Sequence, residues 1–99
     1  MLKQAHVYIK GDVIGVGFRA WTKIQAKIIG VSGWVKNSHD GLGVFKIGGE
    51  VEVVIQGEEE KVNKIIGLFK KGPPVSRVDE IELYWQDPKE IFEGFKVKK

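Results

Sequence analysis

One short segment of the chain contains the residue types best suited to chemistry. It reads Gly15-Val16-Gly17-Phe18-Arg19 and lies between a predicted strand and a predicted helix. Glycine adopts positive φ angles without steric cost, so glycines one residue apart let neighbouring backbone N–H groups turn toward one point. The helix N-terminus adds unpaired N–H groups, and Arg19 adds a guanidinium. This pattern predicts a cradle for a tetrahedral oxyanion such as phosphate; a tight turn whose glycines serve only packing is the alternative left open.

Two other phosphate-binding motifs fit the segment less well. Gly15-x-Gly17-x-x-Ala20 formally matches the dinucleotide fingerprint, with Asp40 further on. A chain of 99 residues is too short for a doubly wound sheet, and its strands alternate in polarity instead of being uniformly apolar. The Gly-Lys-Ser/Thr ending of a P-loop is absent.

Arginine is rare in this chain, which makes each one informative. Of the 16 Lys and Arg residues, only Arg19 and Arg77 are arginine. An arginine among so many lysines suggests a need for the planar fork that grips a carboxylate or phosphate with two hydrogen bonds. Arg19 lies in the glycine-rich segment, whereas Arg77 is expected on an exposed face or paired with Asp79.

Length and composition narrow the function classes. A chain of 99 residues with 42% hydrophobic and 29% charged residues predicts one compact domain over residues 1–99. The absence of cysteine excludes thiolate chemistry and disulfides, and His6 and His39 have no metal-ligand spacing, so no metal site is expected. No segment resembles a membrane span or signal peptide, so we expect a cytoplasmic protein that does not bind membranes. A net charge of +3 is too small to argue for nucleic acid.

Hydrophobic periodicity predicts two helices and at least four strands. The first helix starts at Arg19 and stops at Gly30, and its apolar stripe is Trp21, Ile24, Ile28 and Val31. The second follows three glutamates from Glu58 and stops at Gly72, and its stripe is Val62, Ile65, Ile66 and Phe69. Alternating residues predict strands over 5–10, 32–38 and 80–85 and a short one at 95–97. Residues 42–57 are also strand-rich, and Gly48-Gly49 in their middle marks either a hairpin turn or a bulge inside one long strand.

This order of elements predicts an α+β fold. Strands that alternate in polarity are typical of an antiparallel sheet with one buried face, and two amphipathic helices can cover that face. The order β-α-β-β-α-β, with an extra terminal strand, is that of the ferredoxin-like sandwich.

The glycine-rich segment and the second strand together resemble the signature stretches of the acylphosphatase family. The matching residues are Val13-x-Gly15-Val16-Gly17-Phe18-Arg19 and Gly33-Trp34-Val35-Lys36-Asn37. The segment Val51 to Gly57 is similar to that family's third strand, and Gly72-Pro73-Pro74 with Val78 resembles its exit from the second helix. The resemblance extends over roughly residues 5–97 in the same order and implies the same βαββαβ fold.

The resemblance implies hydrolysis of acyl phosphates to carboxylate and inorganic phosphate, without a metal or a cofactor. By this analogy the phosphoryl group is held by Arg19 and by the amides of the loop, whose residues are Ile14, Gly15, Val16, Gly17, Phe18 and Arg19. Asn37 would orient the attacking water, and Ser38 could support it; a turn asparagine and an exposed serine are the alternatives from the residues alone. The expected partner is a small-molecule acyl phosphate, and we expect a monomer.

The chain departs from the family pattern in three places. Ile14 stands where the family usually has glutamine, and Asp12 places a carboxylate where members often have a basic or neutral residue. Residues 42–50 lengthen the connection after Gly41 and predict an extended hairpin between the second and third strands.

Two alternative functions accompany this interpretation. The first is a non-catalytic phosphate- or carbamoyl-phosphate-binding domain, such as occurs at the front of larger hydrogenase-maturation proteins in the family. The second is a ferredoxin-like nucleic-acid-binding module, in which Trp34 and Trp85 would lie on one sheet face as a stacking platform. The lysines at 96, 98 and 99 are expected to form a solvated chain end.

Overall fold

The computed structural model describes residues 1–39 and 49–99 and contains seven elements. In chain order they are β1 (Leu2–Asp12), α1 (Phe18–Ile29), β2 (Ser32–His39), β3 (Gly49–Glu58), α2 (Glu59–Phe69), β4 (Arg77–Gln86) and β5 (Phe95–Val97). The expected extended hairpin falls mainly on residues 40–48, outside the described residues. Neither α1 nor α2 is long and apolar enough to cross a membrane, and the described residues contain no other helix.

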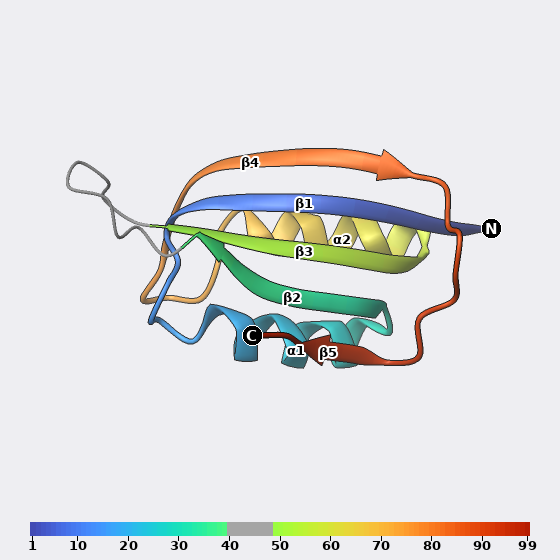
Figure 1. The fold of residues 1–99 in the computed structure, drawn as a ribbon, viewed down its shortest axis with the longest axis horizontal. Helices are drawn as coiled ribbons and strands as arrows, with labels where there is room; N and C mark the ends of the chain where they lie inside the picture. The colour runs from blue at the N-terminus through green and yellow to red at the C-terminus, as the bar shows by residue number, and fades with distance from the viewer. Residues whose placement is uncertain (40–48) are drawn as a thin grey trace.

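The strands form one sheet in the order β4-β1-β3-β2-β5 (Figure 1). β1 lies antiparallel to both β3 and β4, and β2 lies antiparallel to β3. The short β5 runs parallel to β2 and forms the second edge. The predicted ferredoxin-like α+β fold, with a mostly antiparallel sheet, is confirmed.

Both helices cover the same face of this sheet, and the core lies between the two layers. α1 packs on β2 and β5, whereas α2 packs on β1 and β3 (Figure 1). Ala5, Val7 and Ile9 of β1 point into the core and are fully buried, as the period of two predicts. The predicted stripe of α2 is also confirmed, and its members are all buried: Val62, Ile65, Ile66 and Phe69.

The predicted apolar stripe of α1 is wrong in part. Ile24 and Ile28 are 56% and 73% exposed, and the helix instead buries Phe18, Thr22 and Ala26. The buried Thr22 hydroxyl donates to the Phe18 carbonyl at 2.8 Å, so its burial leaves no polar group unpaired. Thr22 and Ala26 are small, and the Thr22 hydroxyl is hydrogen-bonded within the helix, so this side of α1 can pack closely on the sheet. A search for apolar residues at helical spacing does not find such a face.

The two tryptophans lie on opposite faces of the sheet, which corrects the expectation of a shared platform. Trp34 pairs with Val54 and lies on the open face, which we define as the sheet face that the helices leave uncovered. Trp85 pairs with Ala5, whose side chain points into the core, so it lies on the helix-covered face.

The connector between β4 and β5, residues 87–94, links the two edges of the sheet (Figure 1). Gln56 of β3 is 1% exposed and holds this connector in place. Its Nε2 donates to the Glu90 carbonyl at 2.7 Å, and its Oε1 accepts from the Phe92 N–H at 3.0 Å. The connector determines where β5, and therefore the end of the chain, is placed.

Candidate active site

The loop from Val13 to Gly17 joins β1 to α1 through two glycines with left-handed backbone. Gly15 has a φ of 76° and Gly17 a φ of 78°, a region that side chains disfavour. Gly17 is the N-cap of α1, and its carbonyl accepts the Trp21 N–H at 2.9 Å. It provides no side-chain cap, so the N–H groups of the first helical turn keep their capacity to bind an anion.

Arg19 follows in the first turn of α1 and contacts the end of the chain. Its Nη1 donates to the Lys98 carbonyl at 3.2 Å, and Figure 1 shows the C-terminus beside the first turns of α1. A guanidinium has five N–H donors, so this contact leaves most of the fork available. The partner is a neutral backbone carbonyl and does not neutralise the positive charge of Arg19.

Asn37 lies near the end of β2 and reaches the same region from the sheet. It pairs with Val51, and the position two residues earlier, Val35, is fully buried under the helices. The strand alternation therefore turns Asn37 toward the helix-covered face. Immediately after Asn37, the β2–β3 register shifts between Asn37 and His39, so a bulge ends the regular pairing of these two strands.

These residues line one cavity of about 330 Å³. Its described lining consists of Val13, Gly15, Gly17, Phe18, Arg19, Ala20, Asn37, Val97 and Lys99. None of these residues has an acidic side chain, whereas Arg19 and Lys99 have basic ones. Five of the residues predicted from sequence therefore come together in a hollow suited to an anion.

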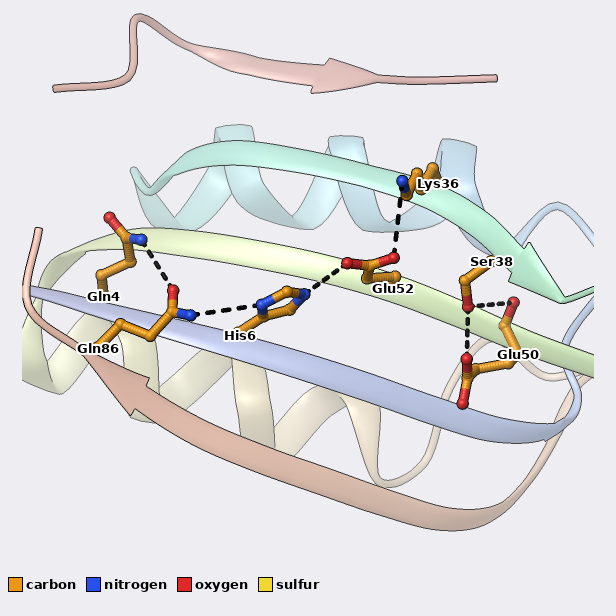
Figure 2. A network of polar contacts seen from close by, with 7 residues as sticks. All are labelled: Gln4, His6, Lys36, Ser38, Glu50, Glu52 and Gln86. Atoms are coloured by element: carbon orange, nitrogen blue, oxygen red, sulfur yellow. Dashed lines mark hydrogen bonds and ion pairs between the residues drawn. The ribbon is translucent and has the colours of Figure 1, made fainter. Parts of the chain in front are cut away.

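Four predicted or doubtful positions lie elsewhere. Ile14 and Val16 are partly buried and pack against the core, so they offer the cavity no side chain. Ser38 donates to the Glu50 carboxylate at 2.7 Å (Figure 2). Asp12 lies opposite Arg77 in the β1–β4 pair, and the cavity lining does not include it.

Sequence reasoning missed three residues of the cavity that come from outside the motifs. Ala20 belongs to α1, and Val97 and Lys99 belong to the end of the chain. The expectation of a solvated lysine tail is incomplete, because the Lys98 ammonium lies 4.4 Å from the centre of the Trp34 ring. The only advance indication was the short apolar alternation at 95–97.

The open face contains a second polar cluster, which ties strands together (Figure 2). His6 Nε2 and Glu52 Oε2 are 2.6 Å apart, and Lys36 Nζ lies 3.8 Å from the other oxygen of Glu52. Nearby, hydrogen bonds from Lys10 to Glu82 and Glu80 raise the pKa of Lys10. Within residues 1–39 and 49–99, no three His, Asp or Glu side chains gather as metal ligands would. These contacts connect β1, β2, β3 and β4 across the sheet.

Arg77, the second arginine, is paired as expected. Its Nε and Nη2 donate to the two carboxylate oxygens of Asp79 at 2.9 and 3.3 Å. These hydrogen bonds, with smaller help from Asp12, raise the pKa of Arg77. The bidentate contact occupies the fork of Arg77, in contrast to that of Arg19.

A larger hollow of about 510 Å³ lies at another part of the molecule, near Met1 and Trp85. Its lining includes two acidic residues, Glu59 and Asp87, beside Lys3, and no arginine. Carboxylates repel a phosphate, so chemistry and not size favours the cavity at Arg19.

Comparisons with known proteins find related sequences and similar structures. The family model described as Acylphosphatase matches residues 5–97. An acylphosphatase of Thermococcus kodakarensis is 45% identical over 95% of this chain and 93% of its own length. The crystal structure of acylphosphatase from Bacillus subtilis superimposes with a TM-score of 0.86 at 30% identity and covers 100% of both chains. Full-length HypF, in a phosphate- and nucleotide-bound form, contains a similar unit with a TM-score of 0.83 and 27% identity, over 12% of its length.

Proposed function

This chain belongs to the acylphosphatase family of enzymes, and from that we propose a metal-independent hydrolysis of acyl phosphates in the cavity at Arg19. The products are a carboxylate and inorganic phosphate. The proposal assigns phosphate binding to Arg19 and to the loop amides between Ile14 and Arg19, and water positioning to Asn37. We also propose that the protein acts as a cytoplasmic monomer without a cofactor.

In this proposal, protein groups alone stabilise the negative charge of the phosphoryl group. The Arg19 fork can bind two phosphoryl oxygens, which a lysine point charge cannot do. The N–H groups of the loop and of the first turn of α1 add preorganised donors beside Gly15 and Gly17. These groups stabilise the negative charge that a metal ion would otherwise offset.

Asn37 is suited to hold the attacking water. Its amide oxygen can accept a hydrogen bond from water, and its NH₂ group can donate to a phosphoryl oxygen. Since it reaches the cavity from β2 while the phosphate cradle comes from the β1–α1 loop, the two elements can hold nucleophile and phosphorus in fixed relation.

The reaction needs no strong base. The water oxygen forms a bond to phosphorus while the bond from phosphorus to the bridging oxygen breaks. The bond electrons stay on the bridging oxygen, which leaves as a stable carboxylate. The protons of the water end on the phosphate product and in solvent, so atoms and charges balance without a further reactant.

One observation supports this proposal most strongly. Two glycines with left-handed backbone, Arg19 and Asn37 come from the β1–α1 loop, the first turn of α1 and β2, and they line the same 330 Å³ cavity. A loop whose glycines served only packing would not require an arginine and a strand asparagine beside it.

The decisive experiment follows benzoyl phosphate hydrolysis by absorbance, with a chelator present. We expect turnover that inorganic phosphate inhibits and the chelator does not. Arg19→Lys should lose about 100-fold or more in kcat/KM while remaining folded, since the fork is lost. Arg77→Lys is the matched control, because Arg77 is exposed and bound to Asp79, and it should retain wild-type activity.

Other outcomes would favour the alternatives. Phosphate binding without turnover of any acyl phosphate would indicate a non-catalytic binding domain. Wild-type rates in Arg19→Lys would contradict the role proposed for the guanidinium. Salt-sensitive binding of RNA or DNA without hydrolysis would favour the nucleic-acid alternative.

A further inference from the structure

The cavity at Arg19 has a polar part and an apolar part. Gly15, Gly17, Arg19, Asn37 and Lys99 line the polar part, and the exposed apolar side chain that lines the remainder, beside Ala20, is Val97. A phosphate needs only the polar part. The apolar part is therefore unexplained by phosphate binding.

We propose that Ala20 and Val97 form a subsite for the acyl group, and that Ile24 extends it for longer chains. This inference rests on the proposed function. It predicts a preference for acyl phosphates with an aryl or alkyl acyl group over the small polar acetyl and carbamoyl phosphates.

The fold places Val97 beside the proposed phosphate position. β5 pairs in parallel with β2, and the Lys98 N–H donates to the Val35 carbonyl at 2.7 Å. The next group, the Lys98 carbonyl, accepts from Arg19. Val97 is thus one residue from the contact with the guanidinium, and it remains 41% exposed although it belongs to a paired strand.

The alternation of β5 separates its apolar and basic side chains. Val97 pairs with the buried Val35 and lies on the helix-covered side, where it lines the cavity. Lys98 lies over Trp34 on the open face. The cavity therefore receives valine from this strand instead of the neighbouring ammonium.

The exposed isoleucines of α1 continue the apolar surface. Ala20, Ile24 and Ile28 are spaced by four residues, so they lie on one side of the helix. One step of four residues advances about 6 Å along the axis. Ile24 and Ile28 are exposed and do not pack in the core. The row of Ala20, Ile24 and Ile28 begins at the cavity, because Ala20 lines it.

Covalent connectivity determines which part of the substrate meets this surface. In an acyl phosphate, one bridging oxygen joins phosphorus to the acyl carbon. When the phosphoryl group occupies the polar part, the acyl group must occupy the adjoining space. Burial of each methylene there should improve binding about fourfold.

The test measures kcat/KM for acetyl, butanoyl, hexanoyl and benzoyl phosphate. In the wild type, kcat/KM should rise with the apolar size of the acyl group, mainly through a lower KM. Val97→Ser should reduce the benzoyl-to-acetyl ratio about tenfold, the loss expected for one to two methylenes of contact. Ile24→Ser should reduce the hexanoyl-to-butanoyl ratio and leave the benzoyl-to-acetyl ratio within about twofold, because benzoyl is too short to reach it.

Matched controls separate this subsite from general effects. Val75→Ser and Ile91→Ser replace apolar residues that are 70% and 73% exposed and do not line the cavity, and both should leave every ratio unchanged. The inhibition constant of inorganic phosphate, which has no acyl group, should change less than about twofold in Val97→Ser.

The possible failures are distinguishable. Equal kcat/KM for all four substrates, or unchanged ratios in Val97→Ser, would overturn the subsite and leave the hydrolysis standing. No turnover of any substrate would overturn the proposed function, and the subsite with it.

Discussion

Arg19 and Arg77 are the same residue type in opposite surroundings. Arg77 holds Asp79 with two hydrogen bonds, so its charge is already paired. Arg19 donates to a backbone carbonyl and lines a cavity whose described residues have no acidic side chain. The difference in partner explains why Arg19, and not Arg77, is assigned to the phosphate.

Asn37 provides the residue-scale prediction. Asn37→Ala should lower kcat for benzoyl phosphate about 100-fold, because the water loses its orientation, and should change KM less. Asn63→Ala, an exposed position on α2, is the matched control and should leave both constants unchanged. Steady-state kinetics measures both. A rise in KM at constant kcat would instead assign Asn37 to substrate binding alone.

At the scale of elements, four segments meet at the site: the β1–α1 loop, the first turn of α1, the end of β2 and the end of β5. The loop supplies donors because its backbone is left-handed at Gly15 and Gly17. β2 supplies Asn37 because its alternation and bulge turn that side chain toward the helices. β5 supplies the apolar side chain of Val97 because it pairs in parallel with β2.

Gly17 tests the role of the loop backbone. A Cβ on Gly17 would meet no atom within 4 Å, so any cost of Gly17→Ala comes from its φ of 78°. We expect a loss of about 1–2 kcal/mol in unfolding free energy and a weaker inhibition by phosphate. Chemical denaturation measures the stability, and steady-state inhibition measures phosphate binding.

Gly67→Ala is the control, and it should change the unfolding free energy in the opposite direction from Gly17→Ala. Gly67 lies within α2, and a Cβ there also meets no atom within 4 Å. Alanine favours a helix interior, so this variant should gain about 0.5–1 kcal/mol. Equal stability changes in the two variants would contradict the backbone argument.

At the scale of the whole molecule, the connector of residues 87–94 joins the two edges of the sheet. β4 forms one edge and β5 the other, so the chain must cross the sheet between them (Figure 1). Gln56, a buried residue near the end of β3, forms hydrogen bonds with the connector's backbone at Glu90 and Phe92. A side chain far from the cavity thereby helps to place Val97 in it.

Gln56→Leu is the corresponding prediction. It leaves the Glu90 carbonyl and the Phe92 N–H without their partner, which should cost about 1–3 kcal/mol of unfolding free energy. Limited proteolysis should cut residues 87–94 faster than in the wild type. Gln25→Leu on α1, where the glutamine is only partly buried, should stay within about 0.5 kcal/mol. Unchanged cleavage in Gln56→Leu would show that the connector is held by other contacts.

The sequence alone determined the elements whose signals are local. The period of two in β1 and the strongly apolar stripe of α2 predicted both elements, because burial of one face requires those spacings. Glycine spacing and the rarity of arginine also identified Gly15, Gly17 and Arg19, since few residue types can adopt that backbone or bind an anion with a fork.

Only the tertiary structure decided which side chains share a space. α1 buries Thr22 and Ala26 and exposes Ile24 because docking selects the face that approaches β2 and β5 most closely, not the most apolar face. Val97 reaches the cavity through a parallel pairing with residues more than sixty positions earlier. Such contacts depend on strand order and on the path of the connector, and neither leaves a periodic trace in the local sequence.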